Sequence, residues 1–167
     1  MGEQHSHCSY CGSPFADIGG WPRVCPACRK TSYRNPLPVV VVILPLNNGL
    51  VVVRRNIEPS KGTLTLPGGY LDLNETWQQG ARRELLEETG IELAAEKIHL
   101  YDVQNGLDDT LVIFGLAEPQ SMTLRPFRSK ETQEVVLIDG PQELGFPNHT
   151  RIVKRYFSGR WQNQKKA

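Results

Sequence analysis

Three glutamates, Glu84, Glu87 and Glu88, are spaced so that a helix would place their carboxylates on one face. Each residue of an α-helix turns by about 100°, so positions i, i+3 and i+4 are neighbours. Like charges on adjacent turns repel each other, and a divalent cation between them removes the conflict. Mg²⁺ takes oxygen ligands and keeps several waters, which leaves room for substrate phosphates. The spacing therefore predicts a metal site for phosphate chemistry. A solvated acidic helix face is the alternative for these three residues taken alone.

All four cysteines lie near the start of the chain, at Cys8, Cys11, Cys25 and Cys28. They form two C-x2-C pairs separated by thirteen residues, a spacing typical of tetrahedral zinc, in which each pair supplies two thiolates. Such a site has no open coordination position, so we predict a structural Zn²⁺ ion. The alternatives are two disulfides, one redox-active pair, or a histidine ligand from His5 or His7. A reducing compartment argues against the disulfides.

The glutamates require a helix, and the sequence predicts one from Thr76 to Thr89, with Asn74 or Thr76 as the cap and Gly90 as the stop. Apolar and β-branched runs, and a turn at Asn48-Gly49, predict strands before and after this helix. The expected strands cover residues 39–44, 50–53, 63–66, 98–103, 110–116 and 134–138, and a second helix covers 148–157. This pattern of hairpins with few helices predicts a mixed α/β (α+β) fold and argues against a doubly wound dinucleotide-binding fold.

The 167 residues, 39% apolar and 22% charged, fit one domain of ordinary size and a small module. Pro36 and Pro38 mark the expected boundary, which gives a zinc ribbon at 1–35 and a second domain at 36–167. The net charge of +1 gives no indication of nucleic-acid or membrane binding. No apolar run is long enough to span a bilayer, and residues 1–7 have no signal-peptide core, so we expect a cytoplasmic protein. Basic residues gather at the end of the chain, at Arg151, Lys154, Arg155, Arg160, Lys165 and Lys166.

The residues around the three glutamates form a longer motif that begins at Gly69. The segment 69–91 fits the pattern G-x5-E-x7-R-E-U-x-E-E-x-G-U, with U an apolar residue, at all nine specified positions. Those positions are Gly69, Glu75, Arg83, Glu84, Leu85, Glu87, Glu88, Gly90 and Ile91. The chain therefore resembles the Nudix hydrolases, a resemblance that implies an α/β/α sandwich around a mixed sheet.

The resemblance extends beyond this motif, which we call the Nudix box. A four-cysteine ribbon before the domain resembles the branch that contains NADH pyrophosphatases. The segments 33–36, 55–60 and 65–71 resemble the corresponding segments of FAD and ADP-ribose pyrophosphatase-like members. The S-Q-P-W-P-F-P-x-S cassette of NADH pyrophosphatases is missing from 101–116, which argues against NADH specificity.

The resemblance also implies roles for residues of the box. Glu84, Glu87 and Glu88, together with the Gly69 carbonyl, would bind Mg²⁺ or Mn²⁺. Arg83 would hold the carboxylates, and Glu75 would support the junction between loop and helix. Many family members take a further catalytic carboxylate from outside the box, for which Glu134 is the first candidate and Glu131 the second.

The implied reaction is hydrolysis of the pyrophosphate bond in a nucleoside diphosphate linked to another moiety, such as FAD, ADP-ribose or NADH. The alternatives are hydrolysis of oxidised nucleotides or RNA caps, and a non-catalytic module that senses a nucleotide. The expected partner is a small-molecule nucleotide rather than a nucleic acid or a membrane, and a homodimer is compatible with the sequence. Candidates for contacts to phosphate or base are Arg54, Arg55, Lys61, Tyr33, Tyr70, Trp77 and Tyr101, for each of which packing or solvation is the alternative.

Overall fold

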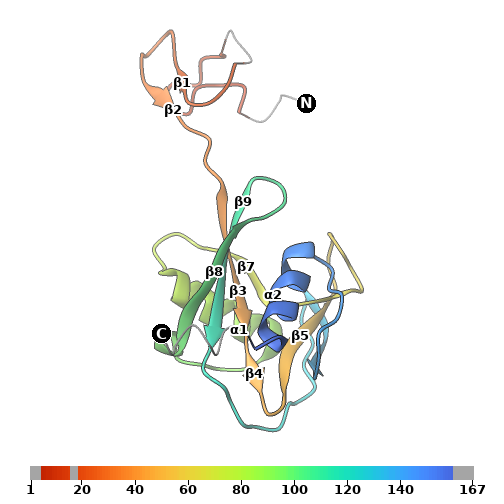
Figure 1. Cartoon of the computed structure of the whole chain (residues 1–167). Coiled ribbons are helices and arrows are strands. Elements are labelled where there is room, and N and C mark those ends of the chain that lie inside the picture. Colours follow the sequence, from red (N-terminus) through yellow and green to blue (C-terminus); the bar gives the residue numbers. More distant parts are fainter. Residues whose placement is uncertain (1–4, 16–18, 160–167) are drawn as a thin grey trace. The chain divides into compact units, whose positions relative to one another are not determined.

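The computed structural model describes residues 5–15 and 19–159, in two compact units that cover residues 1–36 and 37–167 (Figure 1). Of the basic residues near the end of the chain, Arg160, Lys165 and Lys166 lie outside the described residues. None of the helices in the described ranges is both long and apolar enough to cross a membrane.

Within residues 5–15 and 19–36, the first unit has a small antiparallel pair of strands, β1 (Arg23–Val24) and β2 (Thr31–Ser32). The described residues of the second unit, 37–159, form two sheets and two helices (Figure 1). Its elements in chain order are β3 (Leu37–Ile43), β4 (Pro45–Leu46), β5 (Gly49–Arg55), β6 (Leu64–Thr65), β7 (Gly68–Tyr70), α1 (Trp77–Thr89), the 3-10 turn η1 (Ala95–Lys97), β8 (Ile98–Asn105), β9 (Thr110–Ala117), β10 (Thr132–Ile138) and α2 (Pro147–Phe157).

The larger sheet of the second unit has the order β7-β3-β9-β8. Strands β3 and β9 run parallel, whereas β3 with β7 and β8 with β9 run antiparallel, so the sheet is mixed. The other sheet has the order β10-β5-β4, with β6 also paired to β5, and all of its pairs are antiparallel.

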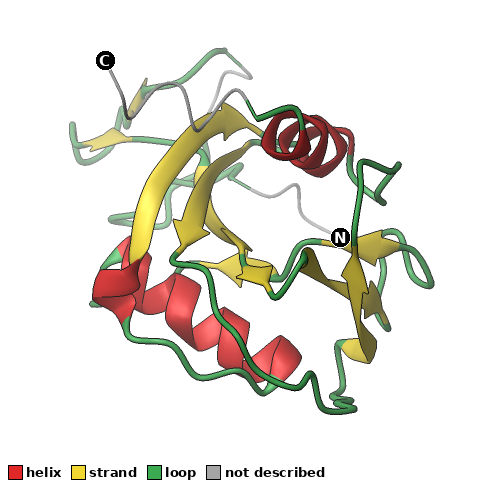
Figure 2. Ribbon diagram, turned by 60° about the horizontal axis from the view of Figure 1, so that its bottom comes forward, coloured by secondary structure: helices red, strands yellow, loops and turns green. Residues whose placement is uncertain are grey.

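Strand β3 is apolar on both faces, and its two faces supply two different cores. Val40 and Val42 belong to the core that contains Ala81 and Leu85 of α1. Val41 and Ile43 alternate with them and belong to the core that contains residues of α2. Successive side chains of a strand point to opposite faces, so a continuous apolar run requires cover on both sides. Figure 2 shows the two helices on opposite sides of the strands, which confirms the expected α/β/α sandwich.

The bounds of helix α1 follow from its end residues. The Thr76 hydroxyl accepts a hydrogen bond from the Gln79 amide, and the Gln79 side chain accepts one from the Thr76 amide. This reciprocal capping box satisfies two amides that the first helical turn leaves unpaired. At the other end Gly90 takes a φ of 70° and donates its N–H to the Leu86 carbonyl. Both predicted end signals are confirmed, and the cap is Thr76 rather than Asn74.

Strand β7 is not among the strands that the sequence predicts, since the predicted strand 63–66 ends before Pro67. Residues 68–70 instead pair with β3, with Gly68 opposite Val41 and Gly69 opposite Val40. Gly68 has a φ of 155°, and a Cβ atom there would collide with the Val40 carbonyl and the Val41 backbone. The glycine therefore allows a close strand approach in place of a turn, a use that the sequence alone does not distinguish.

The Thr76 cap gives a first prediction. Thr76→Ala removes the acceptor for the Gln79 amide and should lower the free energy of unfolding by about 1 kcal/mol. Thr76→Ser keeps the hydroxyl and should stay within about 0.3 kcal/mol of the wild type. Urea unfolding followed by circular dichroism measures both changes. Equal stability of the two variants would show that the cap contributes nothing.

Candidate functional site

A cavity of about 760 Å³ opens in the second unit, large enough for a nucleotide-sized ligand. Its walls come from the end of β5, β7, α1, the β8–β9 hairpin, the segment before β10 and the start of α2. The polar residues of interest that line it are Arg55, Gly69, Asp72, Arg83, Glu84, Glu87, Glu88, Glu131, Asn148 and His149.

The junction of β7 and α1 brings backbone and carboxylates into close contact. The Gly68 N–H donates a hydrogen bond to Glu88 Oε2 at 2.9 Å. A Cβ atom on Gly69 would lie 2.7 Å from all three atoms of the Glu84 carboxylate. Any side chain at Gly69 would therefore displace that carboxylate. The strand and the helix are packed so that carboxylates of α1 rest on the glycine backbone.

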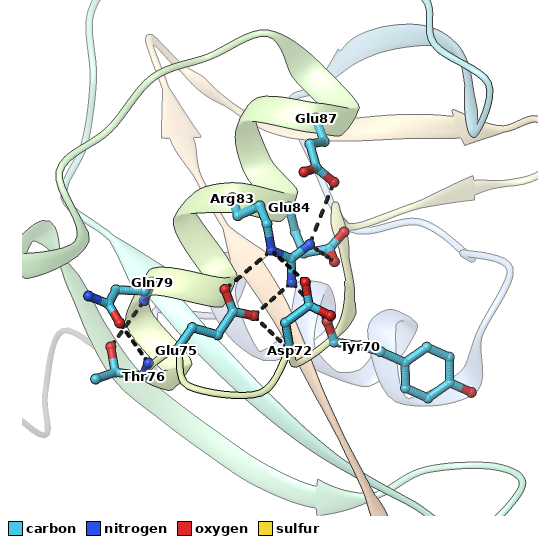
Figure 3. Close-up of polar contacts among 8 residues, drawn as sticks. All are labelled: Tyr70, Asp72, Glu75, Thr76, Gln79, Arg83, Glu84 and Glu87. Atoms are coloured by element: carbon cyan, nitrogen blue, oxygen red, sulfur yellow. Dashed lines mark hydrogen bonds and ion pairs between the residues drawn. The ribbon is translucent and has the colours of Figure 1, made fainter.

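Arg83 connects the loop before α1 with the carboxylates of the helix (Figure 3). Its Nε and Nη2 donate to the two oxygens of Glu75 at 3.2 and 2.7 Å. Its Nη1 donates to Glu84 Oε1 at 2.6 Å and lies 3.5 Å from Glu87 Oε2. Nη2 also donates to the Tyr70 carbonyl at 3.0 Å. One guanidinium thus fixes β7, the loop and the helix to one another, as its planar fork of donors allows.

Burial sets the electrostatics of the three carboxylates. Glu84 and Glu88 are buried, with 8% and 4% of their surface exposed, whereas Glu87 is exposed. Burial raises the pKa of Glu84, against the opposing effect of Arg83. Burial also raises the pKa of Glu88, to about 7, and the charge of Glu84 adds to this rise. Hydrogen bonds from Arg83 lower the pKa of Glu75. Burial and mutual repulsion therefore make Glu84 and Glu88 costly to ionise, and the charges of Arg83 and Arg55 offset that cost only in part.

The two candidates for a carboxylate outside the box occupy different places. Glu131 lines the cavity, and its charge contributes to the raised pKa of both Glu84 and Glu88. Glu134, the first candidate from the sequence, does not line the cavity. It lies opposite Arg54 in the pairing of β10 with β5, and Arg54 Nε donates to its Oε1 at 2.7 Å. This cross-strand ion pair directs Glu134 to a partner on the sheet.

The other residues that the sequence suggests for substrate contact also differ in whether they line the cavity. Arg55 lines the cavity, but Arg54 and Lys61 do not. Among the aromatic candidates in the second unit, Tyr70 alone lines it. Trp77 packs against the core beneath α1, and the Tyr101 hydroxyl accepts a hydrogen bond from Arg155 Nε.

Three residues at the start of α2 that the sequence does not mark as functional also line the cavity: Phe146, Asn148 and His149. They are ordinary residues for a helix start in sequence. Only the packing of α2 on the sheet brings them to the site.

The four cysteines form a second site, in the first unit. They are free thiols, and their sulfur atoms all lie within 4.8 Å of one another. The Sγ atoms are 3.7 Å apart for Cys8 and Cys28, and also for Cys11 and Cys25. Four sulfurs at about 2.3 Å from a central zinc would be about 3.8 Å apart, whereas a disulfide requires about 2.05 Å. The cluster has the dimensions of a tetrathiolate metal site and not of two disulfides.

The two cysteine pairs have the same backbone conformation. The Cys8 N–H donates to the Ser13 carbonyl, and the Cys25 N–H donates to the Lys30 carbonyl in the same way. The residue after each second cysteine, Gly12 or Arg29, has positive φ, 72° and 62°. Its N–H in each case donates to the carbonyl of the first cysteine of the pair. Arg29 therefore forms the same turn as Gly12, although the sequence indicates a less typical turn at Arg29.

Backbone amides also favour the thiolate form of the sulfur. The Tyr10 N–H donates to Cys8 Sγ at 3.4 Å, and the amides of Tyr10 and Cys11 lower the pKa of Cys8 to about 6. The Ser13 hydroxyl lowers the pKa of Cys11. Thiolates are the form that binds metal.

Comparisons with known proteins agree with this geometry. Residues 36–158 match the profile of the NUDIX domain. Over 92 residues the chain is 29% identical to the NAD-capped RNA hydrolase NudC of Edwardsiella ictaluri. That alignment covers 54% of this chain and 35% of the relative, so the chain matches about a third of the length of such curated relatives.

Solved structures show a similar fold over more of the chain. A NUDIX hydrolase from Nitrosomonas europaea is 29% identical, with a TM-score of 0.77, over 94% of this chain and 93% of its own. A bifunctional NMN adenylyltransferase/ADP ribose pyrophosphatase from Francisella tularensis, complexed with AMP and a manganese ion, is 25% identical with a TM-score of 0.57. That match covers 80% of this chain and 41% of the Francisella chain.

The Arg83 network gives a second prediction. Arg83→Lys keeps the charge but loses the fork that bonds Glu75, Glu84 and the Tyr70 carbonyl together, so the free energy of unfolding should fall by about 2 kcal/mol. The neighbouring Arg82 forms one exposed ion pair with Glu92. Arg82→Lys should therefore change stability by less than about 0.5 kcal/mol. Chemical denaturation of both variants is the measurement, and equal losses would contradict a special role for Arg83.

Proposed function

Because the chain belongs to the NUDIX family, we propose that it hydrolyses the pyrophosphate bond of a nucleoside diphosphate linked to a second moiety, releasing a nucleoside monophosphate. One observation carries the proposal: the carboxylates of Glu84, Glu87, Glu88 and Glu131 face one nucleotide-sized cavity together with Arg83. Glu84 and Glu88 are buried, and buried like charges side by side are unfavourable unless a cation offsets them. The substrate and product phosphates, which are also negative, need the same compensation.

The donor set fits a divalent cation that prefers oxygen. Glu84 and Glu88 are buried carboxylates with raised pKa values, Glu87 is exposed beside them, and Gly69 presents backbone without a side chain. These four residues would hold Mg²⁺ or Mn²⁺. When bound, such an ion neutralises charge on phosphoryl oxygens and lowers the pKa of a coordinated water.

The remaining polar residues have roles of orientation and proton transfer. Arg83 holds Glu84 in place and is itself fixed by Glu75, so the carboxylates are oriented before substrate arrives. Glu131 is a carboxylate outside the box that lines the cavity and whose charge acts on Glu84 and Glu88, and it accepts the proton of the attacking water. The new P–O bond forms as the bond from phosphorus to the bridging oxygen breaks, and the leaving phosphate carries away the released charge.

The relatives support a dinucleotide-type substrate. The names of two of them refer to NAD-capped RNA and to ADP-ribose, which share an ADP unit linked through its diphosphate. The finer choice among FAD, ADP-ribose, NADH and a capped RNA depends on residues outside the box. A panel of these four substrates, each assayed with Mg²⁺ and Mn²⁺, distinguishes them.

The cysteine cluster supports a structural zinc ion in the first unit. Its sulfur spacing fits four thiolate ligands at one ion, and four ligands leave no position for substrate. The described residues of this unit form only a two-residue strand pair, so a metal would supply stability that a small core cannot.

The matched acids Glu131 and Glu134 test the catalytic assignment. Glu131→Gln should lower kcat for AMP release from ADP-ribose by about 100-fold or more, because the water loses its proton acceptor. Glu134→Gln should stay within about twofold of the wild type, because its partner is Arg54.

Glu87→Gln should abolish metal-dependent turnover and leave the circular dichroism spectrum unchanged, since Glu87 is exposed. Full turnover in Glu87→Gln would refute the proposed hydrolysis, and equal turnover in the two other variants would refute the role of Glu131.

Metal analysis tests the ribbon. Protein purified without added metal should contain about one zinc per chain by plasma mass spectrometry. Cys25→Ser should lose the zinc, whereas His7→Ala should keep it, because His7 is not one of the four clustered ligands. Two disulfides in place of zinc, detected by mass after alkylation, would refute this assignment.

A further inference from the structure

One part of the cavity is not used by the proposed chemistry. There the end of β5 meets the turn that precedes α2. The Arg55 guanidinium carbon lies 5.3 Å from the centre of the Phe146 ring, at cation–π distance. Arg55 Nε donates to the Pro59 carbonyl at 2.8 Å, which fixes the side chain to its own loop. Both residues line the cavity and are only partly buried.

The turn that carries Phe146 is anchored to the same loop. The Ser60 hydroxyl donates to the Gly145 carbonyl at 3.1 Å, and the Gly145 N–H donates to the Leu64 carbonyl at 2.8 Å. Two segments more than eighty residues apart in sequence are thereby held side by side. The stacked pair of Arg55 and Phe146 is therefore supported from both sides, as a preorganised binding surface requires.

His149 adds a polar group beside this surface. Its ring is buried, with its centre 5.1 Å from that of Phe146 and 5.8 Å from that of Phe114. Its Nδ1 accepts the Leu66 N–H at 3.2 Å. Burial lowers the pKa of His149 to about 3, so the ring is neutral near pH 7. With Nδ1 as the acceptor, Nε2 carries the proton and is a hydrogen-bond donor.

We propose that Arg55 and Phe146 form the recognition site for the nucleobase of the substrate, with the His149 ring as a donor beside it. A nucleobase has a flat π face and hydrogen-bond acceptors on its edge. Aromatic rings and guanidinium planes are the protein groups on which unpaired bases stack. This inference rests on the proposed function, since it assigns the base of the same nucleotide whose diphosphate the carboxylates would act on.

Arg55 lies near both the proposed base site and the carboxylates that would act on the phosphates. Its charge lowers the pKa of Glu88 and that of His149, so it acts on both the carboxylate group and the aromatic group. A nucleotide whose base stacks on Phe146 would have its phosphate within the field of Arg55. Arg54, the preceding residue, is paired with Glu134 and does not line the cavity, which makes it a matched control.

Binding of AMP and of ribose 5-phosphate tests the proposal directly, because the two ligands differ only in the base. Calorimetric titrations are done on the full chain with Mg²⁺ present. Phe146→Leu keeps an apolar side chain but removes the ring, and should weaken AMP binding about tenfold while leaving ribose 5-phosphate unchanged. Phe146→Tyr keeps the ring face and should bind AMP within about twofold of the wild type.

The arginine variants test the phosphate side. Arg55→Ala should weaken both ligands, by about tenfold, whereas Arg54→Ala should weaken neither. Thermal unfolding of each variant verifies that the chain is folded. The proposal is overturned if Phe146→Leu binds AMP as the wild type does, if it loses both ligands equally, or if the two arginine variants behave alike.

AMP has no pyrophosphate bond, so these titrations do not depend on turnover. A chain that binds AMP through Phe146 but hydrolyses no dinucleotide would refute the proposed function and retain the base site. If the wild type and Phe146→Leu both hydrolyse ADP-ribose and select the base equally well, the base site is refuted and the proposed function stands.

Discussion

The contacts of one guanidinium, that of Arg83, hold the candidate active site together. The loop 71–76 has no regular structure, and the bidentate bond to Glu75 and the bond to the Tyr70 carbonyl tie it to the helix. The same group bonds Glu84, a carboxylate that burial would otherwise make costly to ionise. It thus provides orientation and charge compensation at once. Arg83 does not offset the burial of Glu88, which raises the pKa of Glu88 to about 7. What remains is a negative site with fixed geometry, the condition under which a cation binds without rearrangement of its ligands.

The sandwich determines which residues can reach that site. Strand β3 is apolar on both faces and directs Val40 toward α1 and Val41 toward the α2 side, so the two helices must lie on opposite sides. Gly68 and Gly69 then let β7 pass close to β3 and let the carboxylates of α1 approach its backbone. Residues of α1 and the start of α2 line one cavity although they belong to opposite layers. The cavity is therefore a consequence of the strand order and not of either helix alone.

The sequence predicts those features whose geometry is local. The i, i+3, i+4 spacing places the glutamates on one helix face, and the Thr76 and Gly90 signals mark the ends of that helix. The two C-x2-C turns bring four sulfur atoms together. Features that depend on pairing between distant segments were not predictable. Glu134 and Glu131 are both acids near the start of a strand, and only the register of β10 on β5, with its irregularity between Thr132 and Glu134, separates them. Phe146 reaches the cavity because α2 shares a hydrophobic core with residues of β3 and β9, which no local pattern specifies.

This difference between local and non-local geometry also divides the chemistry. The carboxylates that would bind the metal, and the Arg83 that orients them, lie within one strand–loop–helix segment of 23 residues, where each spacing is fixed by the helix and by the Arg83 bonds. The surface formed by Arg55 and Phe146 comes from two segments far apart in the sequence, the end of β5 and the turn before α2, which are joined by a few hydrogen bonds. Substitutions in those segments can change the shape and polarity of the surface without disturbing the carboxylates. It follows that selectivity for the substrate and the ability to break its pyrophosphate bond can vary separately in this fold, and that the Nudix box alone identifies only the bond.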